Sequence, residues 1–110
     1  MYTYKGIVRS VYDGDTFRAD IDLGFDSWIM NADFRLYGIN TPEVRGDSKV
    51  DGQKSRDWLR DQIPVGTEVV IHSIKDKKEK YGRYLAIIYL GERNLNEEMV
   101  SLGLAVPYMV

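Results

Sequence analysis

Residues 11–23, which read VYDGDTFRADIDL, decide the fold of this chain. The dipeptide Asp13-Gly14 is a strong signal for the tight turn of a β-hairpin. Beyond it, apolar and polar residues alternate up to residue 23, and one face carries Phe17, Ala19, Ile21 and Leu23. A period of two is typical of a half-buried strand. The stretch therefore predicts an antiparallel hairpin between strands at residues 3–12 and 15–23.

Further strands are expected over residues 27–39, 67–75 and 83–90, with Gly38 and Pro42 at the exit of the first of these. A helix is expected from about Asp51 to Gln62. A second helix begins at Asn94, with Glu97 in the capping-box position, and ends at Gly103. Five strands with a helix between the third and fourth are the arrangement of an OB-fold. We therefore expect a single β-rich α+β domain over residues 1–110. It is a five-stranded OB-fold-type barrel with one helix between strands 3 and 4 and a second helix after strand 5.

The composition is that of a globular protein, with 44% hydrophobic and 29% charged residues and a net charge of −2. The absence of cysteine excludes disulfides and thiolate metal sites, and no apolar run approaches a membrane span. No signal peptide is visible, so an intracellular protein and a mature secreted form are both open. A polyanion would have to be bound locally, where basic residues cluster: Lys75, Lys77, Lys78, Lys80 and Arg83.

Asp15 is the first candidate functional residue. It shares its strand face with Phe17 and Ala19, so we expect its carboxylate to point inward at the end of a barrel strand. A buried carboxylate is costly unless a cation or hydrogen bonds compensate it. The alternative is that Asp15 only accepts hydrogen bonds within the hairpin turn, which is a common role of aspartate.

Arg35 and Arg83 are candidates for binding a phosphate. Arg35 lies in an apolar strand, and Arg83 follows Gly82 at the start of another. A guanidinium can donate two parallel hydrogen bonds to a phosphate. The alternative for each is a surface arginine whose stem covers apolar neighbours.

Residues 40–43, Asn-Thr-Pro-Glu, form a rigid bend, because Pro42 fixes its own φ and restricts Thr41. The bend would hold the Asn40 side chain, the Thr41 carbonyl and the Glu43 carboxylate in fixed relative positions. Oxygen-only ligands suit Ca²⁺ better than zinc. The alternative is an ordinary proline turn with a solvated glutamate.

Four motifs, in order and with compatible spacing, resemble those of staphylococcal nuclease-like (thermonuclease) domains. They are residues 13–16 (DGDT), 35–43 (RLYGINTPE), 81–89 (YGRYLAIIY) and 96–105 (NEEMVSLGLA). The resemblance covers nearly the whole chain. It implies a calcium-dependent phosphodiesterase of DNA and RNA on a five-stranded barrel, although the same domain also occurs in non-catalytic copies.

The resemblance also implies roles for single residues. Asp15 and the Thr41 carbonyl would hold Ca²⁺, Glu43 would activate or position the attacking water, and Arg35 and Arg83 would bind and neutralise the phosphate.

Three further positions resemble those that contact the nucleotide, and one departs from the family. Lys80 and Tyr81 match positions near the phosphate, and Tyr108 lies close to the nucleotide-contacting tyrosines, although Pro107 changes the local spacing. Asn40 stands where the family has a second calcium-binding aspartate. Its neutral oxygen can still bind Ca²⁺, but the lost charge is expected to weaken the site. We therefore expect an active enzyme that needs more calcium.

A nucleic-acid-binding module without turnover and a structural adaptor domain are the alternatives to a nuclease. Both Asp15 and Glu43 are present, and two carboxylates would repel a bound polyanion without a metal, which favours the nuclease. The expected partner is DNA or RNA, preferably single-stranded, with no membrane contact and a monomeric protein. The chain is expected to lack the long C-terminal helix of some family members. Trp28 and Trp58 are expected in the core, and His72 as an ordinary strand residue.

Overall fold

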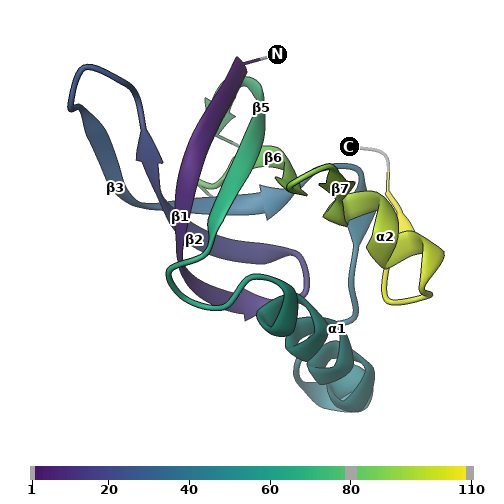
Figure 1. Cartoon of the computed structure of the whole chain (residues 1–110). Coiled ribbons are helices and arrows are strands. Elements are labelled where there is room, and N and C mark those ends of the chain that lie inside the picture. The colour runs from purple at the N-terminus through teal and green to yellow at the C-terminus, as the bar shows by residue number, and fades with distance from the viewer. Residues whose placement is uncertain (1, 79–81, 109–110) are drawn as a thin grey trace.

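The structure, a computed structural model, describes residues 2–78 and 82–108. Figure 1 shows its helices and strands in chain order: β1 (Tyr2–Asp13), β2 (Thr16–Asp22), β3 (Trp28–Leu36), β4 (Ile39–Asn40), the 3-10 helix η1 (Gly46–Ser48), α1 (Lys49–Gln62), β5 (Glu68–Lys78), β6 (Tyr84–Leu90), β7 (Arg93–Asn94), α2 (Leu95–Ser101) and β8 (Val106–Pro107).

The five long strands close into a barrel. Their order is β3-β2-β1-β5-β6 with antiparallel neighbours, and a parallel pairing of residues 34–36 of β3 with residues 84–86 of β6 joins the two ends. The outer part of the β2–β3 hairpin projects beyond this closed region (Figure 1). The predicted β-rich α+β fold, with a five-stranded OB-fold-type barrel and two helices, is confirmed.

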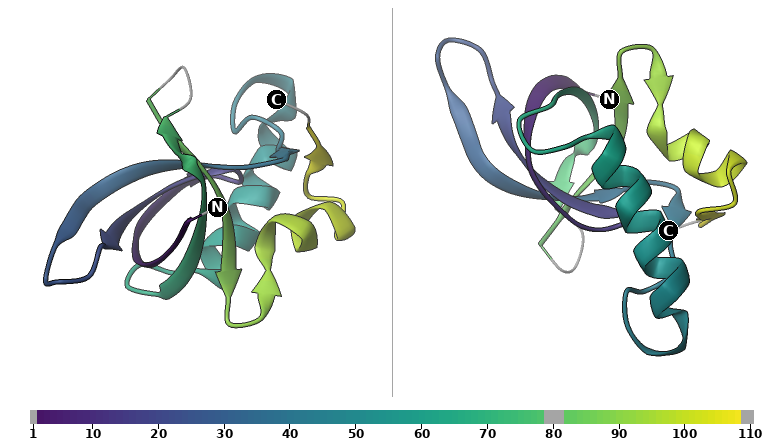
Figure 2. Two further views of the ribbon diagram at one scale, coloured as in Figure 1. Left: turned by 90° about the horizontal axis from the view of Figure 1, so that it is seen from above. Right: turned by 60° about the horizontal axis from the view of Figure 1, so that its bottom comes forward.

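The hydrophobic core fills the barrel and continues under α1, which lies across one end of it (Figure 2). Phe17 and Phe34 stack inside the barrel with ring centroids 5.1 Å apart. The buried face of α1 consists of Gly52, Ser55 and Leu59, spaced as one face of a helix requires. Two of these residues are small, which lets the helix approach the strands closely.

Two local features differ from the sequence-based expectation. The two residues between β1 and β2 are Gly14 and Asp15, because Asp13 remains in β1 and its carboxylate accepts hydrogen bonds from the Asp15 amide (3.2 Å) and the Thr16 hydroxyl. The expected strand over 27–39 is divided into β3 and β4. Gly38 has a φ of +80°, which breaks the strand between them.

Two apolar side chains expected to be buried are exposed: Leu23 by 43% and Trp28 by 45%. Leu23 and Trp28 lie where the β2–β3 hairpin projects beyond the barrel, so no second layer covers them. Trp58 does pack against the core, and His72 lies in β5 with its ring beside Tyr89.

Helix α2 begins as predicted, since the Asn94 side chain accepts a hydrogen bond from the Glu97 amide (3.1 Å). The buried Asn96 then joins this helix to the barrel. Its side chain accepts from the Ile88 amide (3.1 Å) and donates to the Tyr37 and Ala86 carbonyls (2.9 and 3.1 Å). In the described ranges, no helix has both the length and the apolar character that crossing a membrane requires.

Candidate active site

Asp15 connects the β1–β2 turn to the end of β3 and to the loop after β4. Its carboxylate oxygen Oδ2 accepts a hydrogen bond from the Thr41 amide (3.1 Å) and lies 3.7 Å from Nη2 of Arg35. Its backbone carbonyl accepts from the Leu36 amide (2.8 Å). The residue is buried at 7% exposure, in agreement with the inward orientation predicted from the strand alternation. Asp13, rather than Asp15, accepts the hydrogen bonds of the turn, and the Asp15 carboxylate bonds to a residue outside it.

Burial raises the pKa of the Asp15 carboxyl from 3.8 to about 6. A hydrogen bond and charge repulsion from Asp13 act in the same direction, while the Thr41 amide and the Arg35 guanidinium oppose the rise in pKa. The nearby protein cation thus compensates the buried charge only in part, and a further cation at this carboxylate would be stabilised.

Arg35 is folded back over the strand break at Gly38 rather than extended into solvent. Its Nη1 donates to the Leu36 and Ile39 carbonyls (both 3.0 Å), and its Nη2 donates to Oδ1 of Asn40 (3.2 Å). Only 13% of the side chain is exposed. These contacts exclude a surface arginine that merely covers apolar neighbours.

Tyr108 lies beside this arginine, with its ring centroid 5.5 Å from Cζ of Arg35. The Tyr108 amide donates to the Gly38 carbonyl (2.9 Å), and β8 pairs with β4 just before it. The C-terminal segment thus brings an aromatic ring, 45% exposed, to the edge of the site.

Asn40 and Thr41 supply further oxygen atoms next to Asp15. Asn40 is fixed by the pairing of β4 with β8, and Thr41 by its amide bond to Asp15. The hydroxyl Oγ1 of Thr41 is buried without a hydrogen-bond partner among the described residues. A buried orphan oxygen beside a carboxylate fits an oxygen-ligated cation such as Ca²⁺. The set has low charge because Asp15 supplies its one carboxylate, and the described part of the chain contains no cluster of three or more His, Cys, Asp or Glu side chains suited to a metal.

Glu43 is exposed, and its carboxylate makes no hydrogen bond or ion pair with another described residue. Its backbone is nevertheless held firmly. The Ser48 hydroxyl donates to the Glu43 carbonyl (3.1 Å), and a Cβ added to Gly52 of α1 would lie 2.1 Å from that carbonyl oxygen. The helix therefore packs directly against the Glu43 peptide.

Arg83 is half-buried just before β6 and lines a hollow together with Thr16 and Phe34. Neither Asp15 nor Arg35 lines this hollow. Lys80 and Tyr81 lie outside the described residues. The structure thus brings together Asp15, Arg35, Asn40, Thr41 and Tyr108. Glu43 follows this cluster along the chain, and Arg83 precedes Tyr84, whose Cα pairs with that of Phe34 next to Arg35.

The sequence patterns do not identify the small residues that shape the site. A Cβ on Gly14 would lie 2.7 Å from Cβ of Ser55 and 3.0 Å from Cγ2 of Thr41, so the turn, the loop and α1 meet there. The Ser55 hydroxyl in turn donates to the Leu104 carbonyl (2.6 Å). In the helix, the signal available from the sequence is Gly52, because a glycine within a helical pattern often marks a close approach of two backbones.

Several known proteins that are similar to this chain carry nuclease names. The family model described as staphylococcal nuclease homologue matches residues 33–110. A thermonuclease of Staphylococcus hyicus is 33% identical over 106 residues, covering 94% of this chain and 57% of that protein. A thermonuclease of Staphylococcus intermedius is 32% identical, covering 90% of this chain and 56% of that protein. Endonuclease YhcR of Bacillus subtilis is 28% identical, covering 97% of this chain and 9% of that protein. The chain thus spans little more than half the length of the two thermonucleases.

The raised pKa predicts how Asp15 affects stability in the metal-free protein. Since the folded pKa is about 6 and the ordinary value is 3.8, the folded state binds this proton more tightly than the unfolded state. The Asp15 carboxyl therefore contributes most to stability below pH 4. As the pH rises through 6, this contribution is lost, and the free energy of unfolding falls by about 3 kcal/mol. We expect Asp15→Asn to be more stable than wild type at pH 7.5, and this advantage to shrink at pH 4. Urea unfolding in EGTA measures the stability of both proteins at the two pH values. An equal difference between variant and wild type at pH 7.5 and pH 4 would contradict the raised pKa of Asp15.

Gly52→Ala tests the contact between α1 and the Glu43 peptide. In an ordinary helix interior this change stabilises by about 0.5–1 kcal/mol. Here the added methyl group would meet backbone atoms that have to move, so we expect a loss of about 1–3 kcal/mol instead. Urea unfolding measures the difference, with Lys54→Ala at an exposed position of the same helix as control. A stability equal to or above wild type would show that the contact is loose.

Proposed function

The chain belongs to the staphylococcal nuclease homologue family, and on this premise we propose that it is a calcium-dependent nuclease that hydrolyses phosphodiester bonds in DNA or RNA. The observation that carries the proposal is the meeting of Asp15, Arg35 and the Asn40–Thr41 oxygens at one place in the barrel. This arrangement combines a buried carboxylate, a fixed guanidinium and oxygen ligands, which is what a charged diester and a hard cation require.

Arg35 and Arg83 bind the non-bridging oxygens of the phosphodiester in this proposal. Arg35 is already oriented by its bonds to two carbonyls and to Asn40, so little side-chain entropy is lost when a phosphate arrives. Negative charge builds on the same oxygens during attack by water. Positive groups that are fixed beforehand near such oxygens are usually the largest catalytic contribution.

Asp15, the Asn40 side chain and Thr41 would hold Ca²⁺, which would act as a Lewis acid when bound. Glu43 is the proposed base or water-orienting residue. Its exposed carboxylate stands on a backbone fixed by Ser48 and Gly52, so it can reach a solvent molecule without a change in the loop.

The substrate class follows from the same site. Tyr108 offers an exposed ring beside Arg35, and a base that is free of a duplex can stack there. We therefore propose single-stranded DNA or RNA as the preferred substrate. We also propose that the active form is a monomer.

Cleavage of a single-stranded oligonucleotide over a Ca²⁺ titration tests the proposal. We expect wild type to cut in millimolar Ca²⁺ and not in EGTA. Arg83→Ala and Glu43→Gln should each lower the rate by roughly 10²–10³, the effect of losing one group that stabilises the transition state. Lys54→Gln serves as the control, because it removes an exposed charge that has no part in the proposed site.

Two outcomes would overturn this proposal. An Arg83→Ala protein that cleaves at the wild-type rate would remove that arginine from the mechanism. A wild-type protein that binds the oligonucleotide but never cleaves it, even at millimolar Ca²⁺, would instead support a binding module.

Asn40→Asp tests the composition of the metal site. A second carboxylate beside Asp15 adds a unit charge near the cation, and two unit charges 4 Å apart attract by about 4 kcal/mol near a protein surface. Desolvation and the closer pairing with Arg35 offset much of this, so we expect Ca²⁺ to bind about tenfold more tightly. Calorimetric titration without nucleic acid measures the affinity. An unchanged affinity would place the cation away from residue 40.

A further inference from the structure

An open groove lies between the β1–β2 hairpin and α1. A hollow of about 590 Å³ is lined in part by Arg18, Arg60 and Arg83, and a second of about 390 Å³ continues toward Pro64. The two share Ser10, Val11 and Arg60, so they form one depression, here named the arginine groove.

Arg60 is the fixed positive charge in the middle of this groove. Its Nε and Nη2 both donate to the Val11 carbonyl, at 3.1 and 2.9 Å. A carbonyl orients the guanidinium but does not neutralise it, and Arg60 forms no ion pair with any other residue in the described ranges. The guanidinium is therefore pre-oriented and still charged.

The other groups of the groove suit a chain of phosphates with attached bases. Arg18 pairs with Asp33 at 2.6 Å, but both side chains are about half exposed, and such surface pairs contribute little. The unpaired guanidinium of Arg60 therefore gives the groove a positive charge among the described residues. Tyr12 adds a ring that is 66% exposed, on which a base can stack.

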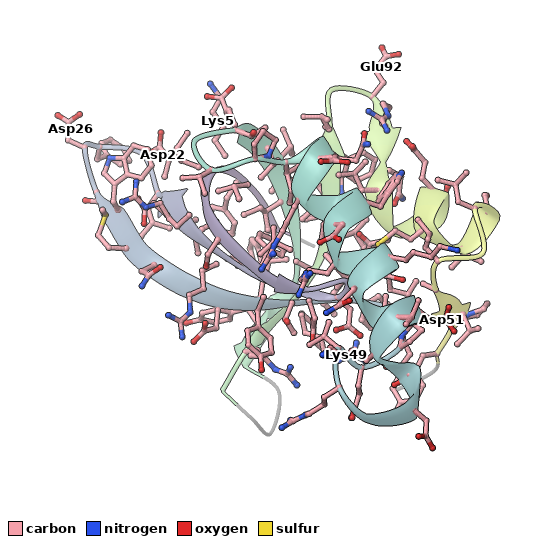
Figure 3. All side chains as sticks on the ribbon, turned by 90° about the horizontal axis from the view of Figure 1, so that it is seen from below. Lys5, Asp22, Asp26, Lys49, Asp51 and Glu92 are labelled. Atoms are coloured by element: carbon pink, nitrogen blue, oxygen red, sulfur yellow. The ribbon has the colours of Figure 1, made fainter. Side chains whose placement is uncertain are left out.

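The acidic end of the hairpin lies elsewhere. Asp22 and Asp26 are at the far end of the β2–β3 hairpin, away from α1, as Figure 3 shows. These two carboxylates therefore lie away from the groove.

We infer that the arginine groove binds the phosphates of a nucleic-acid strand that lie beyond the scissile one. This inference rests on the proposed nuclease function. The groove adjoins the candidate site through Arg83, which lines it, and through Thr16, whose Cα pairs with that of Arg35 across β2 and β3. A single strand with one phosphate at Arg35 and Arg83 would continue past Tyr12 to Arg60. A duplex would have to expose its bases to use Tyr12 in this way.

The test measures binding without cleavage. A labelled ten-nucleotide single-stranded DNA is titrated in EGTA at several salt concentrations with wild type, Arg60→Gln, Ser10→Glu and Lys54→Gln. Each substitution changes the net charge by one unit, but only residues 10 and 60 line the groove. We expect the first two variants to bind several-fold more weakly, and Arg60→Gln to reduce the salt slope by about 0.7, the value for one phosphate contact on a single strand. Lys54→Gln should match wild type.

Strand length provides the second readout. Wild type should bind the ten-nucleotide strand more tightly than a dinucleotide, and Arg60→Gln should lose more affinity for the longer strand. Ser10→Glu changes an exposed residue, so it tests the groove even if removal of the Arg60 bonds to Val11 disturbs the fold.

The inference is overturned if Ser10→Glu and a folded Arg60→Gln bind with the wild-type affinity and salt slope, or if Lys54→Gln weakens binding equally. Because EGTA removes turnover from the measurement, failure of the groove is distinct from failure of the nuclease. A protein that never cleaves can still show the Arg60 effect, and a Ca²⁺-dependent nuclease can lack it.

Discussion

The buried carboxylate of Asp15 is the constraint on which the candidate site depends. One residue receives the Leu36 amide on its carbonyl and the Thr41 amide on its side chain, so a turn, a strand end and a loop are fixed relative to one another. Nη2 of Arg35 lies 3.7 Å from Oδ2 of Asp15 and completes the cluster. The cost is a raised pKa, since burial outweighs these stabilising contacts. A site that holds an under-compensated negative charge in place is already suited to a cation.

Helix α1 makes this arrangement possible because its inner face is small. Gly52 approaches the Glu43 carbonyl, and Ser55 approaches Gly14, so larger residues at either position would separate the helix from the loop and the turn. One and a half turns further along, Arg60 on the same helix bonds to Val11 in β1. The position of one helix thus sets both the Glu43 peptide and the arginine groove. The packing of α1 and the proposed contacts with a nucleic-acid strand therefore both depend on where the α1 backbone lies, and not on one side chain that serves both.

The sequence predicts most of the fold and part of the site, and the differences have physical causes. The alternation of the second strand, extended back to Asp15 in the turn before β2, correctly predicts that this residue is buried, and the Asn94 cap correctly begins α2. The same alternation fails for Leu23, and the expected core position fails for Trp28, because no layer covers the hairpin where these two residues lie. The roles of Gly52 and Arg60 could not be foreseen, since both depend on contacts to residues distant in the chain. Register with a known family, rather than any local pattern, united Arg35 with Asp15.

The balance of charges in the site relates its two proposed properties, the binding of a nucleic-acid strand and the binding of a metal. The arginines at 35 and 83 equal in number the carboxylates at 15 and 43, and Asn40 adds no charge while its oxygen still holds Nη2 of Arg35. A carboxylate at position 40 would give the proposed site more carboxylates than arginines, and a phosphodiester would then be repelled more strongly in the absence of a cation. With asparagine the two numbers are equal, which would reduce the repulsion expected from Asp15 and Glu43 alone. Under the proposed function, strand binding and metal binding would then be separate steps, with the metal needed for hydrolysis rather than for capture.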